Sequence, residues 1–448
     1  MIKCQGGFLI ALLIGSVGCG DDGIGWGGSG GRAGAGGSGG IGGTGGTGGT
    51  AGSGGTGGMA GSGCTARTSG FVTDLNPYPE PALPTLPSAG GTFTDPTFGT
   101  TILRATDAND GPNCTTAYSY WPTFNVNSTR IQIAIGGGNG ATYRFDPVAL
   151  VLSDRQPLYV GPAPGGGTPF QEDAIWSASD PDLLLCHEGA RVWSYNVTTH
   201  AYVLVKDFSA RFPGQYLWQM SRSMDDQVFA FTRRENVTYA VLGYFAWRRD
   251  NDTILLDQDA ETLDEVQVDK TGQYLVVKTG EMGATAIEVR VADLSRGMLF
   301  ADLTDGSPDF APGHSDNGHG TVLGADNWMN RITFRQLATP HQLSSALDFG
   351  NDWTQGAHLS LLADDEARAL VSLYDNGAHT SGRFHDEIIE LSTDGSQSVR
   401  RLAHHRSLVQ GYDDTPRANI SRDGCFVAFT SNWGGSGRRD VFILKLSN

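Results

Sequence analysis

A unit of about 50 residues recurs along most of this chain, and this repeat restricts the fold more than any other feature. Each copy has a polar entry, a short apolar strand, a turn rich in Asp, Asn or Gly, and a second apolar strand. The copies align on seven positions, with spacings of 54, 43, 47, 48, 44 and 58 residues: Pro122, Trp176, Gln219, Val266, His314, His358 and Pro416. No window shows a sustained helical period, so the body of the chain is predicted to be β throughout.

The last copy, Thr415–Ser431, is the clearest, and its Arg-Asp-Gly predicts the tight turn of a hairpin. Only one further strand fits after it, Val441–Leu446, so the last unit lacks a strand. The segment Thr101–Ala105 can supply that strand from the N-terminal side and close a ring without exposed sheet edges. We therefore predict an all-β, seven-bladed β-propeller of four-stranded blades, with the last blade closed by the N-terminal strand.

The N-terminus has the order of parts of a secretory signal: a basic residue, the apolar run Phe8–Ile14, and small residues before Cys19. This arrangement resembles the lipobox of bacterial lipoproteins. The resemblance implies a signal peptide of residues 1–18, lipidation of Cys19, and a protein exported and lipid-anchored in the cell envelope. Gly20 after the cysteine implies sorting to the outer membrane. An ordinary secretory signal with an incidental cysteine is the alternative.

Residues 20–63 contain 25 of the 64 glycines, so residues 19–64 are predicted to form a lipidated, flexible, disordered tether. Residues 65–99 are expected to be an irregular lead-in, and residues 100–448 the propeller. The formal net charge of −17 argues against nucleic acid as a partner. No later apolar run approaches 18 residues, so the anchor is the expected membrane contact, and we expect a monomer.

Four cysteines follow the anchor: Cys64, Cys114, Cys186 and Cys425. An exported protein experiences an oxidising compartment, and four cysteines allow three pairings. We expect Cys64 to pair with Cys114, because both flank the start of the folded body.

In a propeller, the loops that enter the innermost strands meet at one mouth of the central channel. The candidate ligand-binding residues there are Tyr120, Trp121, Trp218, Arg406, Tyr412 and Arg417. Aromatic rings suit sugar stacking, and guanidinium groups suit bidentate binding of carboxylates. Packing in the channel, or ion pairs with neighbouring carboxylates, is the structural alternative for each of them.

The repeats resemble those of TolB-type β-propellers, which read roughly Pro-x-x-Ser-x-Asp-Gly-x-x-Ile-x-Phe. A second resemblance is to oligogalacturonate lyases, propellers in which a histidine of one blade and a Gln-x-x-His-x-His segment of a later one hold manganese. Here Gln355 and His358 match, Ser360 replaces the second histidine, and His314 or His319 stands for the earlier ligand. The resemblance implies a candidate site for a divalent metal (Mn, Zn or Ca).

Two functions remain open on the sequence. The first is a lipid-anchored binding module that presents the channel mouth to a glycan, a peptide or an envelope protein. The second is a metal-dependent lyase acting on uronate polysaccharide. The missing second histidine favours the first.

Overall fold

The computed structural model describes residues 64–136, 138–171, 173–279, 288–303, 312–326, 330–352, 354–375 and 382–447. The predicted signal peptide, Cys19 and nearly all of the tether lie outside these residues. Within the described ranges, no helix has both the length and the apolar character needed to cross a membrane.

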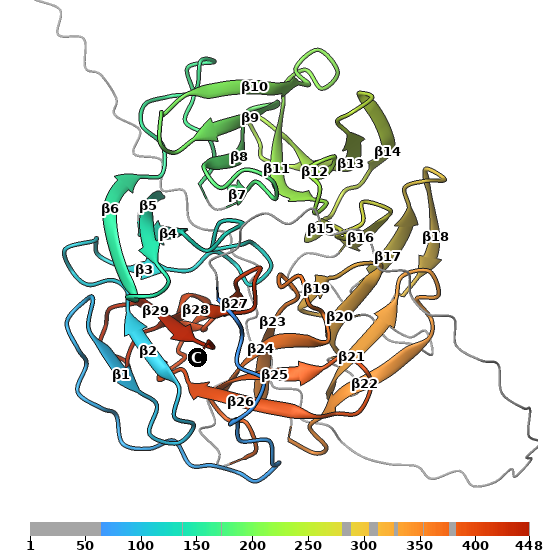
Figure 1. Cartoon of the computed structure of the whole chain (residues 1–448). Coiled ribbons are helices and arrows are strands. Elements are labelled where there is room, and N and C mark those ends of the chain that lie inside the picture. The colour runs from blue at the N-terminus through green and yellow to red at the C-terminus, as the bar shows by residue number, and fades with distance from the viewer. Residues whose placement is uncertain are drawn as a thin grey trace, which may run out of the picture.

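Seven antiparallel sheets stand around a central axis, as Figure 1 shows, so the predicted propeller is confirmed. The first blade contains β3 (Cys114–Thr115), β4 (Arg130–Ile135), β5 (Asn139–Asp146) and β6 (Val151–Pro157). The second contains β7 (Ile175–Trp176), β8 (Leu183–Glu188), β9 (Arg191–Asn196) and β10 (Tyr202–Asp207). The third contains β11 (Gln215–Arg222), β12 (Val228–Glu235), β13 (Val241–Arg248) and β14 (Thr253–Asp259).

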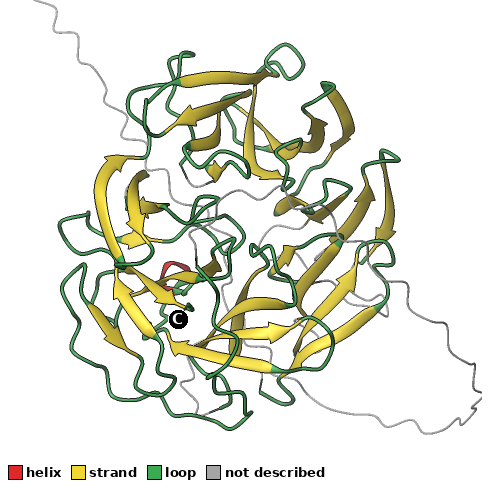
Figure 2. Cartoon of the chain, viewed as in Figure 1, coloured by secondary structure: helices red, strands yellow, loops and turns green. Residues whose placement is uncertain are grey.

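The remaining blades follow the same order, from the innermost strand outward. The fourth contains β15 (Glu265–Val268), β16 (Tyr274–Thr279), β17 (Glu288–Asp293) and β18 (Met298–Asp302). The fifth contains β19 (Ser315–Asn317), β20 (Thr321–Asp326), β21 (Arg331–Gln336) and β22 (Leu343–Asp348). The sixth contains β23 (Gln355–Ser360), β24 (Arg368–Asp375), β25 (Glu387–Ser392) and β26 (Val399–His404). Strands dominate Figure 2, where the short 3-10 helix η1 (Tyr412–Asp414) is the helical element of the described chain.

The seventh blade joins the two ends of the folded body. Its sheet runs in the order β1 (Thr92–Thr94), β2 (Thr101–Arg104), β29 (Asp440–Lys445), β28 (Phe426–Ser431) and β27 (Asn419–Ile420). Thr101 pairs with Lys445, and Arg104 pairs with Phe442. The expected closing strand is therefore confirmed, and β1 adds a fifth strand on its outer side.

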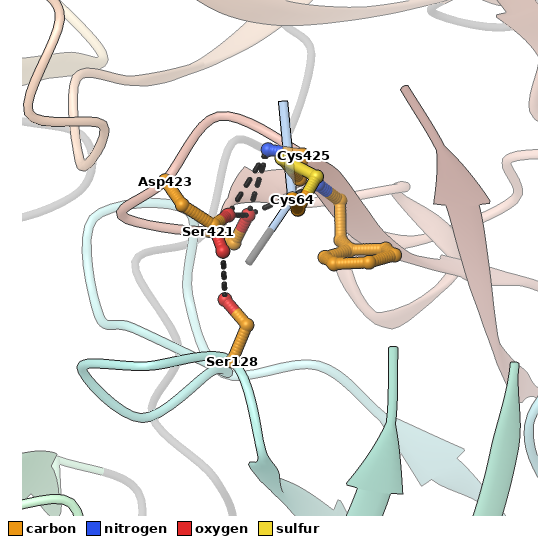
Figure 3. Close-up of a disulfide and its surroundings, with 6 residues drawn as sticks. Cys64, Ser128, Ser421, Asp423 and Cys425 are labelled. Atoms are coloured by element: carbon orange, nitrogen blue, oxygen red, sulfur yellow. Dashed lines mark hydrogen bonds between the residues drawn. A yellow bond between two sulfur atoms is a disulfide. The ribbon is translucent and has the colours of Figure 1, made fainter. Parts of the chain in front are cut away.

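The turn between β27 and β28 shows why its sequence forms a tight hairpin. The Ser421 hydroxyl accepts hydrogen bonds from the Cys425 and Phe426 amides, and donates to Asp423 Oδ1 over 2.6 Å. Gly424 adopts φ +71°, a conformation that favours glycine. Asp423 Oδ2 also accepts a hydrogen bond from Ser128 of the first blade (Figure 3), so this turn ties the last blade to the first.

The expected Cys64–Cys114 disulfide is wrong. Cys64 is bonded to Cys425, which directly precedes β28, as Figure 3 shows. The lead-in begins beside the end of the last strand, where the Arg67 amide donates to the Leu446 carbonyl, and this brings Cys64 to Cys425. Cys114 instead lies buried in β3 as a free thiol, and burial raises its pKa to about 11.

The lead-in packs against the last two blades over much of its length. Arg401 of β26 is fully buried; it pairs with Glu387 and donates to the Asn76 carbonyl, and its guanidinium lies 4.4 Å from the ring centre of Tyr78. Asp95 accepts hydrogen bonds from the His404 amide and from Arg406. Residues 64–99 thus stabilise the closing blades as well as leading into them.

Candidate functional site

The loops that lead into the innermost strands lie on one face of the ring, the mouth of the channel. An aromatic cluster lies at the centre of this face. Tyr118, from the irregular segment after β3, lies within ring-contact distance of residues from three blades. Its ring centre is 5.2 Å from that of His358 and 6.3 Å from that of Tyr412, to which it is nearly parallel. Because Tyr118 is buried, it fills the axis of the propeller at this mouth.

Two predicted histidines meet in this cluster. The imidazoles of His314 and His358 are 4.6 Å apart and nearly parallel, with 12° between their planes. His314 precedes β19, and its Nδ1 donates to the Ala357 carbonyl of β23 over 2.9 Å. This bond holds the His314 ring against β23. The structure thus brings together one imidazole of the fifth blade and one of the sixth.

His358 is a neutral base buried among aromatic rings. It is fully buried, and neither ring nitrogen has a hydrogen-bond partner among the described residues. Burial holds the pKa of His358 well below its ordinary value, and the nearby His314 and Arg417 lower it further. At neutral pH His358 is therefore uncharged.

The other two candidate metal ligands lie elsewhere. Side chains alternate across a strand, so Gln355 and His358 occupy opposite faces of β23. The Gln355 amide donates to the Arg383 carbonyl over 2.6 Å and to Asp352 over 3.3 Å. His319 follows β19 at the end opposite to His314, is half-exposed, and pairs with Glu366 at 2.9 Å.

Two imidazoles alone do not make the expected metal site. In the described ranges, no group of three His, Cys, Asp or Glu side chains is arranged to hold an ion. Protein sites for first-row metals have three or more such ligands. The residues present here therefore do not fit a manganese centre of the expected composition.

Arg417 has a different character from the other candidate arginine. It lies just before β27, is 7% exposed, and its guanidinium sits 5.2 Å from the Tyr412 ring centre. Among the described residues, no carboxylate forms an ion pair with it and no acceptor takes a hydrogen bond from it; its Nε is buried without a partner. Burying a charge without a partner is costly to folding.

A cavity of about 400 Å³ opens beside Arg417, between the first and last blades. Its walls include two tyrosines, four side-chain amides, two arginines and one carboxylate: Tyr118, Tyr412, Asn113, Gln132, Asn139, Gln171, Arg417, Arg439 and Asp413, of which Asp413 pairs with Arg439 at 3.6 Å. Arg439 is paired with Asp414 at 2.9 Å, so Arg417 is the unpaired cation of this wall. Several convergent polar groups beside aromatic rings are typical of small-ligand sites.

Arg406 lies away from this cavity. It is 2% exposed, donates to the Pro81 carbonyl over 2.8 Å, and pairs with Asp95 at 3.3 Å. The lead-in therefore satisfies its charge, and its role is structural in this arrangement.

Tyr120 and Trp121 face the opposite end of the channel. Together with Asp316 and Lys270 they line a smaller cavity of about 80 Å³. The Trp121 indole donates to the Met220 carbonyl, and burial raises the pKa of Asp316 to about 7. The segment from Tyr118 to Trp121 thus separates the two ends of the channel. Trp218 lies on the mouth face, in contact with Phe170.

Sequence reasoning missed the amide wall of the cavity. Gln132 lies on β4, Asn139 starts β5, and Gln171 precedes the second blade. The glycine-rich turn before Asn139 was the available signal, because such a turn at a blade edge brings backbone and short polar side chains to the mouth.

The fold is shared with known enzymes. No protein-family model and no curated protein sequence matches this chain. An oligogalacturonate lyase structure from Vibrio parahaemolyticus is similar, with TM-score 0.56 and 10% identity, covering 79% of this chain and 96% of its own. An oligogalacturonate lyase in complex with manganese has TM-score 0.55 and 11% identity, covering 86% and 99%. Identities this low establish the fold alone. The chain is a seven-bladed β-propeller with the same fold as these lyases.

Proposed function

We propose that this protein is an exported, lipid-anchored β-propeller that binds an acidic glycan at its channel mouth. The observation that carries the proposal is the buried, unpaired guanidinium of Arg417 on the wall of the 400 Å³ cavity. A carboxylate entering this cavity would give Arg417 the charged hydrogen bonds that it lacks.

The contrast with other buried arginines supports this reading. Arg401 is held by Glu387, and Arg406 by Asp95, so the chain pairs these cations internally. An arginine left unpaired beside a cavity is expected to bind its counter-ion from outside.

The rest of the cavity suits a sugar. Hydroxyl groups both donate and accept hydrogen bonds, and the side-chain amides of Gln132, Asn139 and Gln171 do the same. Tyr118 and Tyr412 offer aromatic surface to the apolar face of a pyranose ring. A peptide or an envelope protein would need a wider apolar surface than these walls provide.

The place where the N-terminal segment joins the ring supports an accessible binding site at the mouth. Cys64 joins the ring at Cys425, on the turn after β27, whereas Arg417 precedes β27. The N-terminal segment therefore enters on the face opposite to the mouth, which leaves the cavity accessible on a protein anchored through Cys19. Cys19→Ala should release the protein from the outer membrane, and a variant as firmly membrane-bound as the wild type would contradict the anchor.

A glycan array tests the binding proposal. The full-length protein in detergent should bind polyuronates and should not bind the same chains after their carboxyl groups have been reduced to alcohols. Equal binding of both forms would contradict a role for the carboxylate.

A metal-dependent uronate lyase is the second candidate, because the imidazoles of His314 and His358 meet at the mouth, although the described residues bring no third His, Cys, Asp or Glu ligand to them. The lyase proposal predicts stoichiometric manganese, zinc or calcium in the purified protein, lost in His358→Ala. It also predicts an unsaturated product, detected by its ultraviolet absorbance, when polyuronate is supplied. A metal-free protein that binds polyuronate without cleaving it would contradict the lyase proposal and support the binding function.

A further inference from the structure

A second aromatic cluster lies on the mouth face, over the second and third blades. The Trp218 ring centre is 4.8 Å from that of Phe170 and 6.2 Å from that of Tyr216, both in edge-to-face contact. Tyr239 lies 6.0 Å from Tyr216. We refer to Phe170, Tyr216, Trp218 and Tyr239 as the blade 2–3 platform.

The platform lies on the same face of the ring as the Arg417 cavity. Phe170 precedes the innermost strand β7, Trp218 lies in the first half of β11, and Tyr239 lies in the turn between β12 and β13. Loops before innermost strands and turns between second and third strands share one face of a propeller. Tyr239 is 54% exposed and Trp218 is half-buried, so part of this aromatic surface meets solvent.

Arg234 gives the platform a positive charge. Its guanidinium lies 5.9 Å from the Trp218 ring centre, and its buried Nε has no hydrogen-bond partner. In the described part of the chain, no carboxylate pairs with it. The arrangement repeats the one at the cavity, where Arg417 lies over Tyr412, also without a carboxylate.

The cavity and the platform are continuous along the chain. Gln171 lines the cavity, and its neighbour Phe170 contacts Trp218. We expect a ligand seated at Arg417 to reach the platform by passing Gln171 on the mouth face.

We propose that Trp218 and Arg234 form a second subsite, which binds another uronate residue of the same glycan chain. The proposal rests on the proposed function and deepens it, because two carboxylate subsites require an oligomeric ligand. The indole offers surface to the apolar face of the sugar ring, and Arg234 binds its carboxylate. The preferred ligand is thus an acidic oligosaccharide rather than a single sugar.

Calorimetry with ligands of two lengths tests the subsite. The probes are galacturonate and a galacturonate hexamer, titrated into the full-length protein in detergent. Trp218→Ala and Arg234→Gln should each raise the Kd for the hexamer about 10-fold, the effect of losing one charged or stacking contact, and leave that for the monomer unchanged. Arg417→Gln should raise the Kd for both ligands.

The matched control is Arg249→Gln, an exposed arginine of the same blade in the turn after β13, on the opposite face. It should leave both Kd values unchanged. Arg234→Gln keeps the aromatic packing, so its Kd for the hexamer still tests the subsite if Trp218→Ala is poorly folded. Hexamer affinities within twofold of wild type in Arg234→Gln would overturn the subsite and leave the proposed function standing. A wild type that binds neither probe, or an Arg417→Gln variant that binds both normally, would overturn the proposed function itself.

Discussion

The guanidinium of Arg417 lies 5.2 Å from the centre of the Tyr412 ring, buried and without an anionic partner among the described residues. The ring stabilises the cation through its π face, but a cation–π contact offsets only part of the cost of removing the charge from water. An anion in the cavity would supply the partner that Arg417 lacks among these residues.

The first prediction concerns stability. Arg417→Met should raise the free energy of unfolding by about 1 kcal/mol, because a buried unpaired charge is replaced by an apolar chain of similar length. Arg401→Met is the matched control with the opposite sign: it leaves Glu387 buried and unpaired, and should cost about 3–5 kcal/mol. Urea unfolding of the three proteins measures both values. Equal destabilisation by the two substitutions would show that Arg417 is satisfied within the fold.

The second prediction concerns the lead-in and acid. Burial raises the pKa of Asp95, but hydrogen bonds from His404 and the Phe98 amide outweigh it and lower the pKa to about 2. Because the pKa of Asp95 is lower in the folded protein than its unfolded value of 3.8, the ionised carboxylate stabilises the fold at any pH above 3.8. This contribution is lost as the pH falls through 2. Wild type should exceed Asp95→Asn in unfolding free energy at pH 6, and the difference should shrink by about 2 kcal/mol near pH 2. A pH-independent difference would contradict this.

The third prediction concerns Asp316. Burial raises the pKa of this carboxyl group to about 7. The folded state then holds a proton that the unfolded state has released, so stability falls as the pH rises from 3.8 to 7. Asp316→Asn should remove this slope, which is on the order of 4 kcal/mol over the window. Denaturant unfolding at pH 4 and pH 7 measures it. The same slope in both proteins would show that Asp316 is ionised throughout.

The fourth prediction concerns the disulfide. Cys64→Ser should lower the free energy of unfolding by about 2–4 kcal/mol, because the bond ties the lead-in to the last blade and restricts the unfolded chain. A reductant should lower the stability of wild type by the same amount and leave Cys64→Ser unchanged. Peptide mapping under non-reducing conditions should recover Cys64 linked to Cys425, and a Cys64–Cys114 peptide would contradict the structure.

The ring and its closure were predictable because both depend on periodicity. Seven repeats fix seven blades, and a last repeat short of one strand requires Thr101–Arg104 to complete it. The lead-in has no period, so its path along the last blades, and with it the Cys64–Cys425 pairing, could not be read from spacing.

The candidate site was only partly predictable for the same reason. Unit alignment predicted Tyr412 and Arg417 at the mouth, where the structure has them close to His314 and His358, whereas Tyr120 and Trp121 face the opposite end of the channel. It also placed Arg406 at the mouth, but Asp95 of the aperiodic lead-in covers that side chain. Gln355 and His358 are three residues apart in a strand, which puts them on opposite faces whatever their match to a metal motif.

Calorimetric titration of galacturonate into the full-length wild type and into Arg417→Gln, at neutral pH, measures whether Arg417 binds the carboxylate of a uronate. We predict saturable binding by the wild type and an affinity about 10- to 100-fold lower in the variant, the effect of losing a charged hydrogen-bonded pair. Galactose, which lacks the carboxylate, should bind both proteins equally weakly. Wild-type affinity for galacturonate in Arg417→Gln would contradict binding of the carboxylate by Arg417.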